Sequence, residues 1–406
     1  GASGDTVNIV GTLQNNGSAV EVDSVTFKEG GTNFTNSLLV GTSTTGTLSS
    51  ADGNTGVGTG VLAALTSGDN NVAVGLNSLN ANTTASCNTA IGKSAMAATT
   101  TGCRNVAVGT GALKTNTEGD QNVAVGREAL GVATTADGNT AVGFDSLQAT
   151  TTGAFNTAIG RNSNFSNTTG CRNVAIGLNA AYTSTTSDCS VAIGTNALYS
   201  MTTPNGNIGI GAEALCANTT GVNNTAVGFA ALDANTTGVS NTAFGCNALG
   251  ANTTAHNNTA VGVSASLVST TAQCNVMMGV SSGSTVTTGS CNVFVGHEAG
   301  NGITTASGSV GVGRRAKTGT TGGANNMVGN DTGPSITSGF YNNGFGSSVF
   351  PALTTACNNI AIGHDAGQCT TTGSHNIMIG YKTNTSNTDT ENTIIIGMGD
   401  GINKFI

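Results

Sequence analysis

The chain is poor in charge, aromatic residues and proline, and each shortage excludes a class of protein. Only 8% of its 406 residues are charged, against about 25% in ordinary domains. The 12 basic residues form no cluster, so the basic footprint of a nucleic-acid-binding protein is missing. No apolar run approaches the roughly 18–20 residues of a membrane-spanning helix. Trp is absent and Pro occurs three times, which suits an uninterrupted ladder of strands.

A repeated five-residue motif, Asn-(Thr/Val)-Ala-(Val/Ile)-Gly, dominates the sequence instead. With degenerate copies it occurs 22 times between Ser37 and Gly397, at a spacing of 17 residues, except for a 16-residue step from Ser309 to Asn325. A fixed period this short predicts a solenoid in which each coil packs on its neighbours. The clearest copies are Asn71–Gly75, Asn105–Gly109, Asn139–Gly143, Asn173–Gly177, Asn224–Gly228 and Asn258–Gly262.

The columns of the repeat, numbered 1 to 17 from the asparagine, predict one coil. Columns 1–4 alternate as a strand does, and column 1 is Asn in 18 of 22 copies, which predicts a ladder of side-chain amides. Column 5 is always Gly, which predicts an unusual backbone angle or a close approach. Column 4 is always apolar, as at Val227 and Ile176. The column 5 glycines include Gly75, Gly109, Gly143, Gly177 and Gly228.

The remaining columns predict a second strand and two turns. Column 8 is often Ala and column 9 Leu, as in Ala231-Leu232, and we expect a second short strand there. Asn218–Gly221 (NTTG) is typical turn sequence. The fold class predicted is therefore all-β, a parallel β-solenoid of about 22 coils built as a flat roll.

Columns 3 and 9 exchange bulk along the chain. Ala107 is followed by Leu113, whereas four later copies, beyond a change of core style near residue 258, combine a large column 3 residue with Gly in column 9. Conserved volume indicates one packed layer. We expect columns 2 and 4 to fill the thin core of the roll, and the layer of columns 3 and 9 therefore to lie between chains. The inter-chain residues predicted are Met277, Phe294 and Met327.

Three segments follow from the register. Residues 1–36 precede it, and Thr6–Leu13 and Ala19–Phe27 predict two strands around the turn signal Asn15–Gly17, a docking or capping hairpin. Residues 37–397 form the repeat shaft. Residues 398–406 show no cap, although a solenoid end exposes strand edges, so we expect a partner, a threefold junction or a further domain to cover this end.

The ten cysteines show no Cys-x-x-Cys spacing typical of zinc sites. Six precede column 1, and Cys274 and Cys291 share a column on consecutive coils. Such neighbours have a suitable Cα spacing, but their parallel Cβ vectors strain a disulfide. We expect free thiols that act as small packing groups, and an oxidised Cys274–Cys291 pair remains the alternative.

No convergent group of titratable residues predicts catalysis. His297-Glu298 and His364-Asp365 occupy the same columns four coils apart, and Asp120 and Asp137 recur two residues before the motif. We expect these histidines and carboxylates to be solvated turn residues. A histidine ring on a threefold axis or a calcium site between aspartates is the alternative. We expect no catalytic residue, cofactor or metal, and no receptor-binding residue can be named.

The motif resembles the head repeats of trimeric autotransporter adhesins, which are left-handed parallel β-rolls. Its longer form, Asn224–Gly238 (NTAVGFAALDANTTG), looks still more like bacteriophage tail fibres, and the resemblance covers about 360 of 406 residues. It implies a non-enzymatic, homotrimeric tail fibre of a virion that contacts other tail or baseplate proteins and mediates or positions attachment to a host surface receptor, a glycan among the candidates. The alternative is a bacterial or archaeal surface adhesin or extracellular filament subunit.

Overall fold

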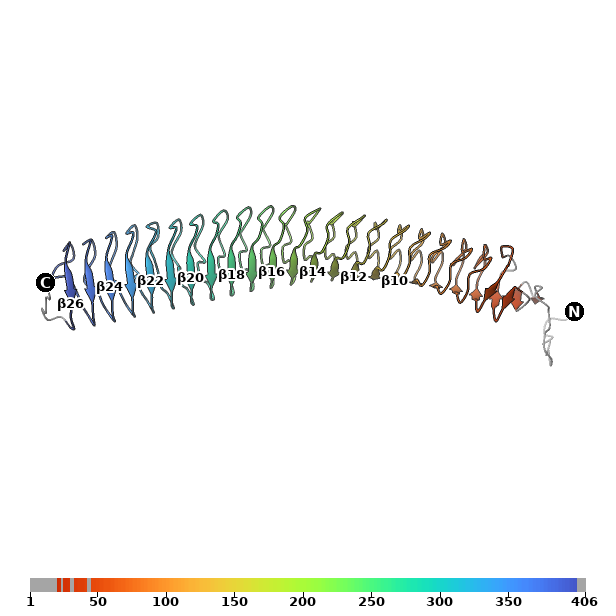
Figure 1. Ribbon diagram of the computed structural model, residues 1–406, viewed down its shortest axis with the longest axis horizontal. Helices are drawn as coiled ribbons and strands as arrows, with labels where there is room; N and C mark the ends of the chain where they lie inside the picture. The colour runs from red at the N-terminus through yellow and green to blue at the C-terminus, as the bar shows by residue number, and fades with distance from the viewer. Residues whose placement is uncertain (1–19, 23–24, 30–32, 42–44, 400–406) are drawn as a thin grey trace, which may run out of the picture. The chain divides into compact units, whose positions relative to one another are not determined.

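The computed structural model describes residues 20–22, 25–29, 33–41 and 45–399, and the chain forms two compact units that meet in sequence between Asn173 and Val174. Both units consist of short strands and turns, and the described residues contain no helix. Figure 1 shows, within each unit, the strand arrows lying side by side with one loop leading from each to the next.

The first unit contains β1 to β12. These strands are β1 (Val20–Val22), β2 (Val25–Glu29), β3 (Phe34–Thr35), β4 (Leu38–Val40), β5 (Ala51–Asp52), β6 (Thr55–Val57), β7 (Val72–Val74), β8 (Thr89–Ile91), β9 (Val106–Val108), β10 (Val123–Val125), β11 (Thr140–Val142) and β12 (Thr157–Ile159).

The second unit contains β13 to β26. These strands are β13 (Val174–Ile176), β14 (Val191–Ile193), β15 (Ile208–Ile210), β16 (Thr225–Val227), β17 (Thr242–Phe244), β18 (Thr259–Val261), β19 (Val276–Met278), β20 (Val293–Val295), β21 (Val310–Val312), β22 (Asn326–Val328), β23 (Asn343–Phe345), β24 (Ile360–Ile362), β25 (Ile377–Ile379) and β26 (Ile394–Ile396).

Each unit is a parallel β-solenoid with one strand per coil. Strands of the repeat pair with the copy one repeat further on, so that Ala107 lies opposite Ala124 in the first unit and Met277 opposite Phe294 in the second. The all-β, parallel-solenoid prediction is confirmed for both units. The left-handed winding and the trimer stay predictions.

The predicted second strand is absent from the described coils, where columns 6–10 form turns. Alternate residues there have left-handed backbone angles, for example φ 54° at Glu128 and φ 51° at Leu130. A strand requires negative φ throughout, so the Ala-Leu pair at columns 8 and 9 cannot form an extended strand. The turns nevertheless bond from coil to coil, because the Leu113 N–H donates to the Ala129 carbonyl at 3.0 Å.

Columns 3 and 9 fill the interior of each coil. Ala107 and Leu113 are fully buried, and in later coils Phe294 occupies the space that a Cβ on Gly300 would need. The inference that the two columns share one layer is thus correct. Its assignment to the space between chains is wrong for Met277, Phe294 and Met327, since all three are 0% exposed within their own chain. Strand alternation puts column 3 alone inside, and columns 2 and 4 face outward.

Glycine in column 5 meets two requirements at once. Its φ is 122° at Gly75, 134° at Gly177 and 138° at Gly228, a region that L side chains rarely adopt. A Cβ on Gly228 would also lie 2.5 Å from the Gly245 carbonyl oxygen of the next coil. Gly109 and Gly143 have the same geometry, both at φ 140°.

The column 1 asparagines form a buried ladder. Asn122 is 0% exposed, and its Oδ1 accepts the backbone N–H of Asn139 at 3.0 Å. Its Nδ2 donates to the Ala136 carbonyl at 2.6 Å. The repeat of these bonds satisfies backbone groups that are buried away from water and would otherwise remain unpaired.

Antiparallel strands precede the repeat. β1 pairs with β2, with Glu21 opposite Thr26, and β2 pairs with β4, the first strand of the repeat. Ala19–Phe27 therefore holds parts of two strands, β1 and β2, and its prediction as one strand is wrong. The alternating pattern of the sequence continues through residues 23–24 and gives no sign that two strands are present. β2 covers the edge of β4. Thr6–Leu13, Asn15–Gly17 and residues 400–406 lie outside the described residues.

The 16-residue step shortens a turn and leaves the strands in register. Val310 pairs with Asn326 and Val312 with Val328. The Lys317 N–H donates to the Thr332 carbonyl, as column 9 does elsewhere, and Thr320 already occupies the place of column 13. The missing residue therefore lies between Lys317 and Thr320. A deletion inside the strand would have turned its side chains to the wrong face.

Candidate functional site

Columns 2 and 4 form an apolar surface, here called the outer sheet face, on each unit. We expected Val227 and Ile176 inside the roll, but both are only partly buried, because one strand per coil leaves interior room for column 3 alone. Larger residues of the same face are more open: Phe244 is 49% exposed and Met278 41%. The face repeats on successive strands of both units, and other members with at least 36% exposure are Leu38, Val57, Ile91, Val125, Ile159, Phe345, Ile362, Ile394 and Ile396.

Column 16 is an acceptor column, defined by side chains that accept a backbone N–H from the preceding coil. Asp137 Oδ1 accepts the N–H of Asp120 at 2.8 Å, and Ser307 Oγ accepts that of Ser290 at 2.9 Å. Asp, Ser, Asn, Cys and His all serve. Other members are Asp69, Ser86, Cys103, Asp120, Cys171, Asn205, His256, Ser290 and Ser374.

The acceptor column explains residues that the sequence left ambiguous. The carboxylates of Asp120 and Asp137 bind backbone N–H groups, and Cys103 Sγ does the same for Ser86 at 3.3 Å. All ten cysteines are free, including Cys274 and Cys291, as expected. Both of these side chains are exposed, so their predicted role as small packing groups is wrong. Among the described residues no three His, Cys, Asp or Glu side chains gather closely enough to hold a metal ion.

The sequence-predicted histidine pairs stay apart as two local contacts. His297 Nδ1 lies 3.8 Å from Glu298, and His364 Nδ1 lies 3.0 Å from Asp365. Each pair belongs to its own coil of the second unit, with the histidine side chain about half exposed. The structure does not bring the two pairs into one site.

An ion-pair cluster lies beside the shortened coil and was not predicted. Arg315 Nε is 2.6 Å from Asp331 Oδ1, and Arg314 reaches Oδ2 at 2.8 Å. The Arg315 hydrogen bond is the main cause that lowers the pKa of Asp331. Nearby, burial lowers the pKa of Lys317. The sequence signal that could have indicated this cluster is the lysine in column 9, where Leu is the most frequent residue.

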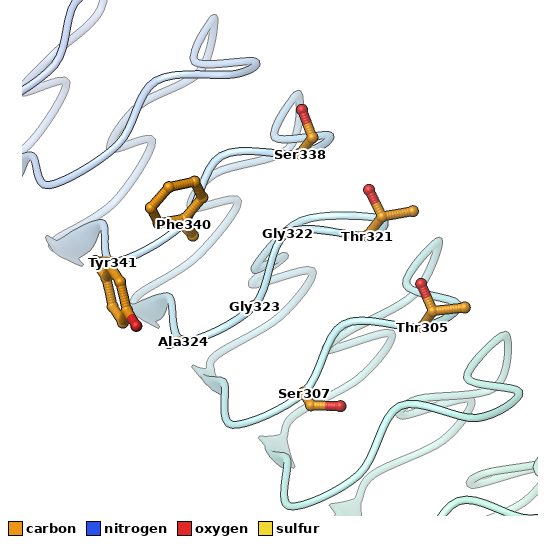
Figure 2. A pocket seen from close by; sticks show the side chains of 9 residues that line it. All are labelled: Thr305, Ser307, Thr321, Gly322, Gly323, Ala324, Ser338, Phe340 and Tyr341. Carbon is orange, nitrogen blue, oxygen red and sulfur yellow. The ribbon is translucent and has the colours of Figure 1, made fainter.

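A groove opens over three consecutive coils of the second unit. Its volume is about 560 Å³, and it is lined by Thr305 and Ser307 on one coil, residues 321–324 on the next, and Ser338, Phe340 and Tyr341 on the third. Figure 2 shows the rings on one coil and the glycine backbone of the middle coil between them and Ser307. Sequence reasoning missed it, although Phe340-Tyr341 in columns 16 and 17 is the chain's only adjacent aromatic pair.

No helix in the described part of the chain is long and apolar enough to cross a membrane. Comparison with protein-family models, with curated proteins and with solved structures gives no match to this chain.

Proposed function

We propose that this chain is a non-enzymatic fibre subunit that assembles as a homotrimer through its outer sheet face. The observation that carries the proposal is the apolar face itself, whose most exposed members lie on alternate strands from Val57 to Ile159 and on five strands between Phe244 and Ile396. Contiguous apolar patches of this extent are rare on monomeric soluble proteins and mark interaction surfaces.

A second and third copy of the chain are the partners that this face fits. The face repeats with the spacing of the coils, about 4.8 Å, and an identical chain in parallel presents apolar side chains at the same spacing. Closed cyclic symmetry completes such an assembly without leaving an open face. The threefold state rests on the resemblance to trimeric adhesin heads and phage tail fibres.

The fibre is proposed to serve as a tail fibre of a virion. It would be held by other tail or baseplate proteins and would position or perform attachment to a host surface receptor. Support comes from the repeat architecture, in which the described coils have turns that are hydrogen-bonded from coil to coil around a thin core. Such a surface displays side chains at regular intervals along the coils.

The assembly is tested by measuring mass with light scattering after size exclusion. We expect three times the 39.6 kDa of the chain. The double variant Phe244→Asp/Met278→Asp places unpaired charges in the proposed interface and should yield monomers with an unchanged circular dichroism spectrum.

A matched control is Thr220→Glu, an exposed column 14 change that copies Glu118. It should leave the trimer intact. A monomeric wild-type chain would refute the interface, and a dimer would refute the threefold state. Immunogold electron microscopy with antibodies to the chain should label tail fibres of virus particles; labelling of cell envelopes alone would refute the virion assignment.

A further inference from the structure

The groove over Gly323 coincides with a break in the acceptor column. Ser307, Gly323 and Phe340 occupy column 16 on three successive coils. Ser307 still accepts from the coil before it. Gly323 has no side chain and Phe340 has no acceptor atom, so neither accepts the N–H of the preceding coil. Ala154, Val222 and Val239 interrupt the same column elsewhere, and at Gly323 and Phe340 the interruption coincides with a groove. The backbone N–H groups of Ser307 and Gly323 thus lack their usual side-chain acceptor where the groove opens.

Close packing leaves no room for a side chain at the two glycines of the middle coil, Gly322 and Gly323. A Cβ on Gly323 would collide with the carbonyl oxygen of Ser307, and a Cβ on Gly322 with that of Gly339. The middle coil therefore contributes backbone where its neighbours contribute side chains. The depression is a consequence of the backbone path at these two residues.

Two aromatic rings stand at the wall of the groove and remain open to solvent. Phe340 is 45% and Tyr341 57% exposed. The rings meet edge to face, with centroids 5.3 Å apart and an interplanar angle of 84°. Edge-to-face contact is a preferred aromatic geometry, so each ring stabilises the orientation of the other. One apolar face and one phenol hydroxyl are presented to a ligand.

The rest of the lining is hydroxyl and backbone, without charge. Thr305, Thr321 and Ser338 place hydroxyls on three successive coils along the turn, as Figure 2 shows. None of the lining residues is Asp, Glu, Lys, Arg or His. A charged ligand would therefore find no counter-charge to offset its desolvation.

We propose that this groove is a binding subsite for a neutral glycan. A pyranose ring has an apolar C–H face that packs on an aromatic ring and hydroxyls that pair with Ser and Thr side chains and with backbone N–H groups. The groove's volume of about 560 Å³ lies within the roughly 300–1,000 Å³ of small-ligand sites. The inference rests on the proposed attachment function and names the class of receptor.

The test is titration calorimetry of the full chain with neutral hexasaccharides of glucose and of N-acetylglucosamine, and with acidic hexagalacturonate. At about 5 mM ligand, affinities down to the millimolar range are detectable. At least one neutral probe should bind, and hexagalacturonate should bind more weakly. Tyr341→Asn should weaken binding roughly tenfold, because the stacking surface is lost.

The variants follow templates within the chain. Tyr341 has φ 58°, which Asn tolerates, and Asn223 and Asn358 hold the same column at φ 57° and 59°. Phe340→Ser copies the acceptor of Ser374. The matched control is Phe155→Asn, an equally exposed column 17 ring of the first unit.

Three outcomes would overturn the subsite. They are failure of every neutral probe to bind, full binding by the Phe340→Ser/Tyr341→Asn double variant, and equal loss in Phe155→Asn. A fourth is a change of oligomeric mass in the double variant, which would make the groove a chain interface. Loss of glycan binding with an intact trimer leaves the fibre proposal standing, so the two proposals fail separately.

Discussion

The coils of Asn105–Gly143 and those of Asn275–Gly346 share one backbone fold but differ in their core residues and surface features. In the first region the core is Ala with Leu, as at Ala124 and Leu130; in the second, three coils combine Met or Phe with Gly, as at Phe294 and Gly300. The first keeps an unbroken 17-residue period, whereas the second contains the short coil, the Arg-Asp cluster and the aromatic groove. The regular region thus shows what the fold requires, and the irregular region shows what it leaves free.

The comparison separates the columns by task. Columns 1, 3, 5 and 9 hold both regions together, through the asparagine ladder, the core layer and the glycine approach. Columns 6, 7, 16 and 17 change identity without disturbing strand register, as the in-register pairing of Val310 with Asn326 demonstrates. New chemistry is therefore expected in the second set.

The largest effect is expected from the core. Phe294→Ala should lower the free energy of unfolding by about 3–5 kcal/mol, because the ring is fully buried and leaves a cavity. Adding Gly300→Leu should recover most of this loss by converting the coil to the Ala-Leu core of the regular region. Leu tolerates the backbone there, since Leu113 and Leu130 have φ of 49° and 51°. Urea denaturation measures both.

Gly300→Leu alone is the control, and it should destabilise, since its side chain would overlap the Phe294 ring. If the double variant is less stable than Phe294→Ala, columns 3 and 9 do not share interchangeable volume and the comparison of the two cores fails.

The asparagine ladder should give the next largest effect. Asn122→Ala leaves the Asn139 N–H and the Ala136 carbonyl without partners, at a cost of about 2–4 kcal/mol. Asn325→Ala should cost more, because its Nδ2 also donates to Thr318 in the shortened turn. Thermal unfolding of both variants tests the ranking. An equal cost would mean that the short coil does not depend on this bond.

Much of the fold could be predicted from the sequence, because periodicity reports packing directly. The 17-residue spacing gave the parallel pairing, and the exchange of bulk between Phe294 and Gly300 gave the shared core layer. The asparagine ladder also followed from column 1. What periodicity could not decide was which strand face lies inside. Val at columns 2 and 4 is as apolar as Ala at column 3, and only the small interior makes Ala the buried residue.

The turns and the groove escaped prediction for a different reason. Leu has no preference for positive φ, so Leu130 at φ 51° carries no local signal. The acceptor column is chemically mixed, and Asp137, Cys103 and His256 look unrelated until one shared bond groups them. The groove at Gly323 is a gap in that column, and a gap is visible only when the column is known.

A smaller effect is expected in the acceptor column. Asp137→Ala removes the acceptor of the Asp120 N–H and should cost about 0.5–1.5 kcal/mol. Asp137→Ser should restore most of it, as Ser86 does for Asp69. Hydrogen exchange at the Asp120 amide should quicken in the Ala variant alone. Unchanged exchange there would mean that water replaces the carboxylate without loss, and that the gap at Gly323 carries no unusual donors.

The smallest effect belongs to the ion pairs of the irregular region. Arg315 lowers the pKa of Asp331, so the carboxylate's contribution is present above its unfolded pKa of about 3.9 and is lost as pH falls through the lower folded value. Asp331→Asn should therefore destabilise at pH 7 by less than about 1 kcal/mol, since the side chain is 28% exposed. At pH 2 the difference from wild type should shrink. Glu118→Gln, an exposed turn carboxylate of the regular region, should change urea midpoints less at pH 7. If Asp331→Asn instead gains stability relative to wild type as pH rises from 2 to 7, the cluster is not a stabilising ion pair.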